Sequence, residues 1–374
     1  MRKYTGNPDY QHDTRPCLGV LLTNLGTPDA PNTRAVRKYL AEFLSDPRVI
    51  EVPRPLWWLI LHGIILRFRP RSSAHAYSQV WTSEGSPLLS WGNKQSRAIL
   101  DELAMRQPGP IKIELAMRYG NPSIQSGLEK LRDCGAERIL IFPLYPQYSS
   151  TTTASTFDAV AAVMKTWRWM PELRMVTHYH DNVKYIEAVA ESIRTYWQKN
   201  GQPEILLFSF HGLPEDYFRA GDPYHCECHK TARLVAENLE LNDDQWQVCF
   251  QSRFGPRAWL KPYTDETLAE LARNGIKKVN VICPGFSADC LETLEEINIR
   301  YREVFLENGG ERFEYIPALN DQSRHIEALT DIIIQHCQGW PEVSSDWNLT
   351  DYESEIQTRQ NRFKLLKNSN SKQN

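Results

Sequence analysis

A histidine stands at the end of an apolar run in this 374-residue sequence. The run LFSFHGLP, residues 207–214, starts like a buried parallel strand and breaks at His211, which a Gly-x-Pro turn follows. Such a histidine is either a hydrogen-bonded core side chain or one that the strand presents for proton transfer or metal binding. The second interpretation requires other polar groups that face the same place.

Carboxylates in the segment CPGFSADCLETLEEI supply such groups. Ser287 is a plausible N-cap, which predicts a helix that begins near Ala288. Glu292 and Glu296 are four residues apart and share one face of that helix, and Asp289 lies on the same side. The row is either a solvated helix face or a line of carboxylates opposite a histidine, which can bind a divalent cation and relay protons.

The elements that must position these groups alternate between strand and helix. Strands that alternate with helices predict an α/β fold with parallel sheets. Helical patterns lie between most of the predicted strands, for example at 32–44, 123–133, 183–199 and 264–274. Four strands are predicted in each half, at 18–22, 111–117, 138–142 and 173–177, and then at 205–210, 247–251, 278–282 and 313–316.

The two halves repeat one another. LLTNLGTP matches LFSFHGLP, RYGNP matches RFGP, and GAERILIFPLYPQYSS matches GIKKVNVICPGFSADC, in the same order. Each match alone is weak, because strand, Gly/Pro turn and helix are general to this fold, but three in register indicate a duplicated unit. In such halves a ligand binds at the carboxyl ends of the strands and in the cleft between domains. His211 aligns with Leu25, so the cleft is expected to have one reactive and one apolar wall.

The matches divide the chain into two domains. The first is predicted at 17–175, completed by a helix at 321–338, and the second, which carries the metal site, at 176–320. The first half has an insertion at about 50–100, and long insertions of this kind are usually functional. Residues 341–374 are interpreted as a polar tail or an isolated helix that contributes little to folding.

The insertion contains the apolar run PLWWLILHGIILRF, residues 55–68. It is too short to span a bilayer, which needs about 20 apolar residues. It is either a buried helix or an exposed apolar lip for a large apolar ligand, a membrane surface, or both.

Composition excludes other classes of protein. The net charge of −3 lacks the basic footprint of nucleic-acid binding. The N-terminal residues lack the apolar core of a secretory signal, and eight scattered cysteines are no disulfide framework for a chain of this length. We therefore expect a cytoplasmic protein with no nucleic-acid partner.

Two other segments contain the residue types of metal ligands. HCECHK places Cys226 and Cys228 between two histidines, but this spacing differs from the usual C-x₂-C of zinc sites. The segment is either a metal or cluster site or a reactive, unoccupied thiol pair. HYH, residues 178–180, follows a predicted strand and is interpreted as a pair of loop histidines.

Six motifs together resemble the ferrochelatase family, most closely its proteobacterial type. They are LLTNLGTPDAP, GSPLL, LYPQYSSTTTAST, FSFHGLP, QSRFGPRAWLKPYTDETL and CPGFSADCLETLEEI, and the resemblance runs from about Cys17 to about Cys337. It implies two similar Rossmann-like, chelatase-type domains, each with a four-stranded parallel sheet flanked by helices. It also implies a lyase that inserts Fe²⁺ into protoporphyrin IX to form protohaem, the terminal step of haem biosynthesis.

The resemblance assigns roles to individual residues. His211 matches the family's invariant histidine and Glu292 its essential glutamate, both implicated in metal binding and in removal of the pyrrole protons. Glu296 matches the next member of the acidic row, but Arg300 stands at the row's further position, which interrupts the acidic path to the surface. The residues expected to bind the porphyrin are Leu25, Arg118, Tyr119, Trp259, Phe286 and Asp289.

The resemblance also bears on cofactors and partners. Fe²⁺ is a substrate, and no cofactor is required. Ser150 stands where many animal members have the first ligand of a [2Fe–2S] cluster, but some bacterial members place cluster cysteines elsewhere, so Cys226 and Cys228 leave that question open. The 55–68 segment matches the family's apolar lip, which takes up porphyrin and in some members touches the membrane. Peripheral contact with the inner membrane is therefore expected here.

The residues leave three alternatives. One is a chelatase for another tetrapyrrole, such as coproporphyrin, or for another metal. Cobalt chelatases of this superfamily typically use a second metal-binding histidine, and none stands near Glu292. The second is a porphyrin-binding protein without catalytic activity. The third is an interaction scaffold in which the row of carboxylates is only the solvated face of a helix.

Overall fold

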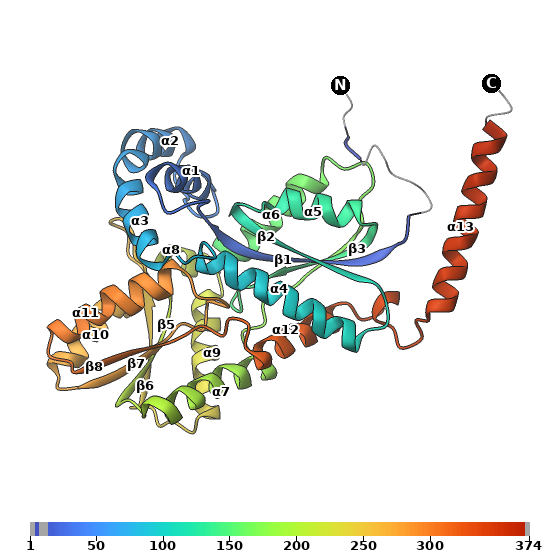
Figure 1. The fold of residues 1–374 in the computed structure, drawn as a ribbon. Coiled ribbons are helices and arrows are strands. Elements are labelled where there is room, and N and C mark those ends of the chain that lie inside the picture. Colours follow the sequence, from blue (N-terminus) through green and yellow to red (C-terminus); the bar gives the residue numbers. More distant parts are fainter. Residues whose placement is uncertain (1–3, 7–13, 371–374) are drawn as a thin grey trace.

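Eight strands form two four-stranded parallel sheets in the computed structural model, which describes residues 4–6 and 14–370. The first sheet has the strand order β2-β1-β3-β4 and the second the order β6-β5-β7-β8, so the two halves share one topology. Figure 1 shows the sheets in different parts of the molecule, each with helices packed around it. The expected α/β fold class, with two similar four-stranded domains, is confirmed.

All eight predicted strands are present. β1 continues past its predicted end at residue 22, because its last residues still pair with β2, where Gly26 faces Tyr119. The strands are β1 (Cys17–Thr27), β2 (Ile111–Gly120), β3 (Ala136–Pro143), β4 (Glu172–Met175), β5 (Ile205–His211), β6 (Trp246–Gln251), β7 (Lys278–Ile282) and β8 (Arg312–Ile316).

The helices that cover the sheets also join the halves. α12 packs against both α7 and α4, and one apolar cluster contains Leu140 of β3, Phe208 of β5 and Leu329 of α12. The two sheets therefore share a continuous core. The covering helices are α1 (Thr33–Leu44), α4 (Pro87–Arg106), α5 (Ile124–Asp133), α6 (Ser155–Met164), α7 (Val183–Asn200), α8 (Glu215–Arg219), α9 (Tyr224–Asn238), α10 (Thr264–Arg273), α11 (Arg302–Glu307) and α12 (Ser323–His336).

The acidic helix begins later than the sequence predicts. It is a π-helix, η3 (Glu292–Tyr301), that continues into α11, and the expected start near Ala288 is wrong. The backbone N–H of Asp289 donates to the side chain of Asn320 (2.8 Å), which holds this residue outside the helix. The N–H of Cys290 donates to Thr293 Oγ1 (3.0 Å), so Thr293 rather than Ser287 satisfies a backbone donor at the helix start.

The insertion forms a helical projection made of α2 (Arg54–Ile60), the short π-helix η1 (Leu61–Ile65) and α3 (Leu66–Val80). Trp57, Leu61 and Leu66 pack against α1 and Tyr119, while other apolar side chains of the same segment are exposed. Figure 1 shows α1, α2 and α3 gathered together beside the first sheet. Among the described residues, no helix has the length and apolar character needed to cross a membrane.

The C-terminal segment is more closely attached than predicted. Its main element is α13 (Leu349–Asn370), which Figure 1 shows at the edge of the molecule, beyond the short 3₁₀ turn Pro341–Val343. Ile356 is buried, Tyr352 donates a hydrogen bond to the carbonyl oxygen of Pro16 (2.9 Å), and Arg15 pairs with Glu353. The expectation of an isolated segment is therefore wrong for the first half of this helix.

Candidate active site

His211 is the last residue of β5, an interior strand that lies between β6 and β7. Its Nδ1 lies 2.7 Å from the carbonyl oxygen of Gly212. Because a carbonyl oxygen only accepts, Nδ1 carries the proton, and Nε2 remains as the nitrogen that can accept a proton or bind a metal. The side chain is only partly buried, so a substrate can reach it.

Gln251 connects the strand that carries His211 to the acidic helix. It faces His211 across the β5–β6 pairing and accepts a hydrogen bond from Ser209 Oγ (2.8 Å). Its Nε2 donates to the backbone carbonyl of Glu292 (2.9 Å) and lies 3.4 Å from Glu296 Oε2. One buried amide thus brings the end of β5 and the first turn of η3 into a common network.

Glu292 begins η3, which packs against α3, and its neighbour Leu291 joins the apolar cluster that contains Leu61 and Leu66. Glu292 is half-buried, and its charge adds to burial in raising the pKa of the phenols of Tyr39 and Tyr77. Burial lowers the pKa of Arg69 on α3, while the nearby Glu292 and Glu296 act in the opposite direction. This carboxylate therefore stands where the lip meets the second half, among phenols and one guanidinium.

Glu296, in contrast, is held by its neighbours. Its carboxylate accepts hydrogen bonds from the N–H of Ser252 (3.1 Å), from Ser252 Oγ and from Tyr301 Oη (2.8 Å). Arg300 lies 3.7 Å from Glu296 and about half of its side chain is exposed. The acidic row therefore ends at Glu296, whose carboxylate is fixed by hydrogen bonds, and Arg300 follows it.

Trp259 forms a wall next to His211. A Cβ atom built on Gly212 would lie 3.2 Å from the indole Cε3 and 2.8 Å from the carbonyl oxygen of Gln251. The indole N–H donates to the carbonyl oxygen of Phe254 (2.9 Å), which fixes the ring plane. Only glycine at 212 allows the ring this close to the His211 turn.

In the first half, Arg118 and Tyr119 belong to a polar network around Asp46. Arg118 Nη2 and Tyr119 Oη both contact Asp46 Oδ2, at 2.6 and 2.8 Å, and Ser155 Oγ donates to the same oxygen (2.6 Å). Burial alone would raise the pKa of Asp46, but the hydrogen bonds from Ser155, Arg48 and Tyr119 hold it below its usual value. Tyr119 is fully buried, while Arg118 retains some exposure.

The remaining predicted substrate residues have different surroundings. Leu25 is half-buried in the same apolar cluster as Leu291, the neighbour of Glu292. Phe286 is partly buried and packs against two clusters, one within the second half and one that also contains Leu88 of α4. Asp289 is buried, and its carboxylate accepts from Tyr315 Oη (2.6 Å) and Asn320 Nδ2 (2.7 Å).

Cys226 and Cys228 point to different sides of α9. Cys228 is fully buried in the main core, and burial raises the pKa of its thiol, whereas Cys226 is exposed. Residues two apart on an α-helix do not face each other. The fold therefore does not bring these two sulfur atoms together.

Several residues of this site belong to no motif that predicts their role. Gln251, Asp46 and Ser155 are polar residues whose partners are distant in sequence. The position of Gln251 at the end of a predicted strand does indicate that it lies near the site, because polar side chains at the carboxyl ends of parallel strands gather near ligands.

Comparison with known proteins gives the family. The ferrochelatase family model matches residues 17–337. The chain belongs to the ferrochelatase family. It is 59% identical to the ferrochelatase of Nitrosococcus oceani over 91% of this chain and 92% of that protein. It is 55% identical to that of Thioalkalivibrio sulfidiphilus over 94% and 95%, and 56% identical to that of Marinobacter nauticus over 90% and 91%.

A solved structure with little sequence similarity shares the fold. SirB from Bacillus subtilis with Fe³⁺ superposes with a TM-score of 0.50 at 12% identity, covering 88% of this chain and all of that one. This similarity supports the two-domain architecture alone. The family membership makes this chain an enzyme of metal insertion into porphyrins, as the motifs implied.

Proposed function

We propose that this protein inserts Fe²⁺ into protoporphyrin IX at the carboxyl end of β5, with His211 and Glu292 as the reacting groups. The single observation that carries the proposal is the Gln251 side chain, which links the His211 strand to the first turn of η3. It ties a histidine whose proton is on Nδ1, so that Nε2 can accept one, to a helix whose first residue is a half-buried glutamate. Imidazole and carboxylate are both ligands for Fe²⁺.

The reaction requires two protons to leave the pyrrole nitrogens as the metal enters. The charge then balances, because a doubly charged ion replaces two protons. His211 Nε2 accepts one proton, and Glu292 takes the other or, where it binds Fe²⁺ instead, the second proton leaves to water.

The macrocycle needs an apolar slot, because it is a flat aromatic disc. Trp259 beside Gly212 offers one aromatic surface, and Leu25 together with the lip offers an apolar one. Arg118 and Phe286 are the partly accessible residues at its margin. Such a slot excludes water and strengthens the interactions of the charged groups within it.

Tyr119, Asp289 and Glu296 act differently in this proposal from what the motifs imply. All three are buried and fully engaged with protein partners. Tyr119 orients Asp46 and, through it, Arg118, while Asp289 holds the loop before η3 and Glu296 anchors Ser252. They are positioning residues rather than groups that touch porphyrin or metal.

The lip supports a peripheral position at the inner membrane. Trp58, Leu59 and Phe68 are exposed by 59%, 61% and 73%, and the exposed Arg67 and Arg71 stand beside them. Aromatic and aliphatic side chains flanked by arginines suit the boundary of an anionic bilayer. A porphyrin dissolved in that bilayer would reach the slot beside the lip.

Protein purified as the full chain should convert protoporphyrin IX and Fe²⁺ to haem, followed by the loss of porphyrin fluorescence. His211→Ala should lower turnover by at least about 100-fold, because a positioned general base contributes that much. Porphyrin binding, measured by quenching of tryptophan fluorescence, should survive. Coproporphyrin assayed beside protoporphyrin IX tests the substrate, and undiminished turnover in His211→Ala would contradict the proposed mechanism.

A further inference from the structure

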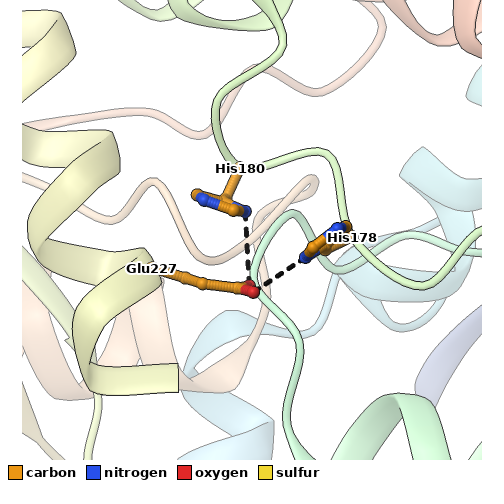
Figure 2. Close-up of side chains that lie close together, drawn as sticks. All are labelled: His178, His180 and Glu227. Carbon is orange, nitrogen blue, oxygen red and sulfur yellow. Dashed lines mark hydrogen bonds and ion pairs between the residues drawn. The ribbon is translucent and has the colours of Figure 1, made fainter. Parts of the chain in front are cut away.

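A second group of metal-ligand side chains lies outside the site described above. Two of its members, His178 and His180, follow β4 in the segment that connects the two halves. The third is Glu227 on α9. One ligand atom from each residue lies within 4.8 Å of the others, and Figure 2 shows both imidazole rings aimed at the carboxylate.

The distances suit a shared ligand. His178 Nδ1 lies 2.7 Å from Glu227 Oε1, and His180 Nδ1 lies 3.3 Å from Glu227 Oε2. A tetrahedral metal ion with ligands at about 2.1 Å separates neighbouring ligand atoms by about 3.4 Å. The His180–Glu227 pair already has that spacing. The closer His178–Glu227 pair is a hydrogen bond, and His178 is half-exposed and free to move outward.

His180 has an unexplained buried nitrogen. Its side chain is 7% exposed, and Nδ1 makes no hydrogen bond within the part of the chain that the structure describes. The nitrogen nevertheless points at the carboxylate (Figure 2). Buried polar atoms in native proteins have partners, and an absent ion is one recognised reason for an orphaned one.

The neighbours of the cluster hold it in place and set its charge. The N–H of Tyr148, in the loop after β3, donates to Glu227 Oε2 (2.7 Å) and fixes the carboxylate, as outer hydrogen bonds do around metal ligands. Asp181 lies 3.9 Å from His180 Nε2 and binds Lys230. The lysine charge is therefore matched by Asp181, and Glu227 remains to balance a cation.

We propose that His178, His180 and Glu227 bind a divalent transition-metal ion, of the Fe²⁺ or Zn²⁺ class, at a site separate from His211 and Glu292. Two imidazoles and one carboxylate are the donor set of His₂Glu zinc sites and of the 2-His-1-carboxylate iron sites, both of which leave further positions open. The exposed side of His178 is where water would complete the coordination. Bound metal would join the loop after β3, the connecting segment and α9, and so link the two halves.

The test uses Co²⁺ alone as the probe, because Co²⁺ bound by imidazole and carboxylate absorbs visible light. The full chain with His211→Ala removes the main ligand of the proposed active site and should still bind one equivalent of Co²⁺, displaced by Zn²⁺. Adding His178→Ala, at a half-exposed position that leaves the core intact, should weaken Co²⁺ binding more than tenfold. Glu227→Gln, which retains an acceptor for the Tyr148 N–H, should do the same.

Adding His75→Ala to His211→Ala is the matched control, because His75 is an exposed histidine away from the cluster, and it should change nothing. Zn²⁺ should raise the melting temperature of His211→Ala but not of the His178→Ala double variant. Absence of Co²⁺ binding by His211→Ala would overturn the proposal, as would equal binding by the double variant. Neither readout involves turnover, so the result is independent of the proposed reaction.

Discussion

At the scale of single residues, the site depends on Gln251 as much as on the groups expected to react. The oxygen of this amide accepts a hydrogen bond from Ser209, and its nitrogen donates to the Glu292 carbonyl and to the Glu296 carboxylate. A buried amide with satisfied partners orients what it touches. The separation between the β5 end and the start of η3 therefore depends on one side chain that need not touch the substrate.

Gln251→Met keeps the side-chain length and removes both hydrogen-bonding ends. We expect turnover to fall by about 10- to 100-fold, the range observed when partners that orient metal ligands are lost. The KM for Fe²⁺ should rise, whereas the affinity for porphyrin should change little. Steady-state assays at varied Fe²⁺, with circular dichroism to confirm the fold, measure this, and wild-type kinetics would refute a positioning role.

At the scale of elements, the start of η3 shows why local signals were insufficient. Ser287 is a good N-cap type, but it is buried, and the chain at Asp289 is instead held by Asn320, 31 residues further along. No spacing within the segment indicates that contact. The resulting helix is of the π type, a form that is rare and often found at functional sites.

The C-terminal helix α13 is another element whose attachment depends on distant partners. Its polar composition predicts no docking, yet Ile356 is 3% exposed and Arg359 lies 3.4 Å from Glu137 of β3. Among the described side chains of α13, Ile356 alone is buried, and together with a few polar contacts it makes a weak attachment. Its opening should therefore be measurable without unfolding the protein.

Ile356→Ala should destabilise the docked helix by about 2 kcal/mol, because a buried isoleucine loses most of its apolar contacts. Amide hydrogen exchange within residues 349–366 should then accelerate by about 30-fold. Leu365→Ala is the matched control, since Leu365 lies on the same helix and is 69% exposed. Equal exchange in both variants would show that Ile356 does not hold the helix.

At the scale of the whole molecule, the duplication could be predicted because the second half repeats the strands and turns of the first in the same order. The placement of His211 followed from the repeat, since the carboxyl ends of parallel strands meet at one edge. The meeting of His178 and His180 with Glu227 could not be predicted, because it joins two segments that gave no metal spacing separately. The contacts of His178 and His180 with Glu227 span 47 to 49 residues of sequence and are made by the tertiary fold.

The stability of the whole fold should depend on pH through His325. This histidine is fully buried on α12, its Nδ1–H donates to the carbonyl oxygen of Asn320 (2.8 Å), and burial lowers its pKa to about 4. The unfolded value is about 6.5, so the unfolded chain binds the proton first. The contribution to stability is therefore complete above pH 6.5 and is lost as the pH falls from 6.5 towards 4.

His325→Asn keeps a donor near Asn320 and removes the titrating group. Between pH 7 and pH 5 the wild-type protein should lose about 2 kcal/mol more free energy of unfolding than the variant. Urea denaturation at the two pH values measures this difference. Parallel losses in both proteins would show that His325 is not the group responsible.

The lip is the surface that would place the whole molecule against a bilayer. Trp58→Ser with Phe68→Ser removes two exposed apolar side chains, each of which contributes about 2 kcal/mol when it is taken out of water. Co-sedimentation with vesicles that contain an anionic phospholipid should therefore fall at least tenfold. Phe157→Ser is the matched control, because Phe157 is 55% exposed on α6, outside the lip. If the control lowers sedimentation equally, general surface hydrophobicity rather than the lip binds the membrane.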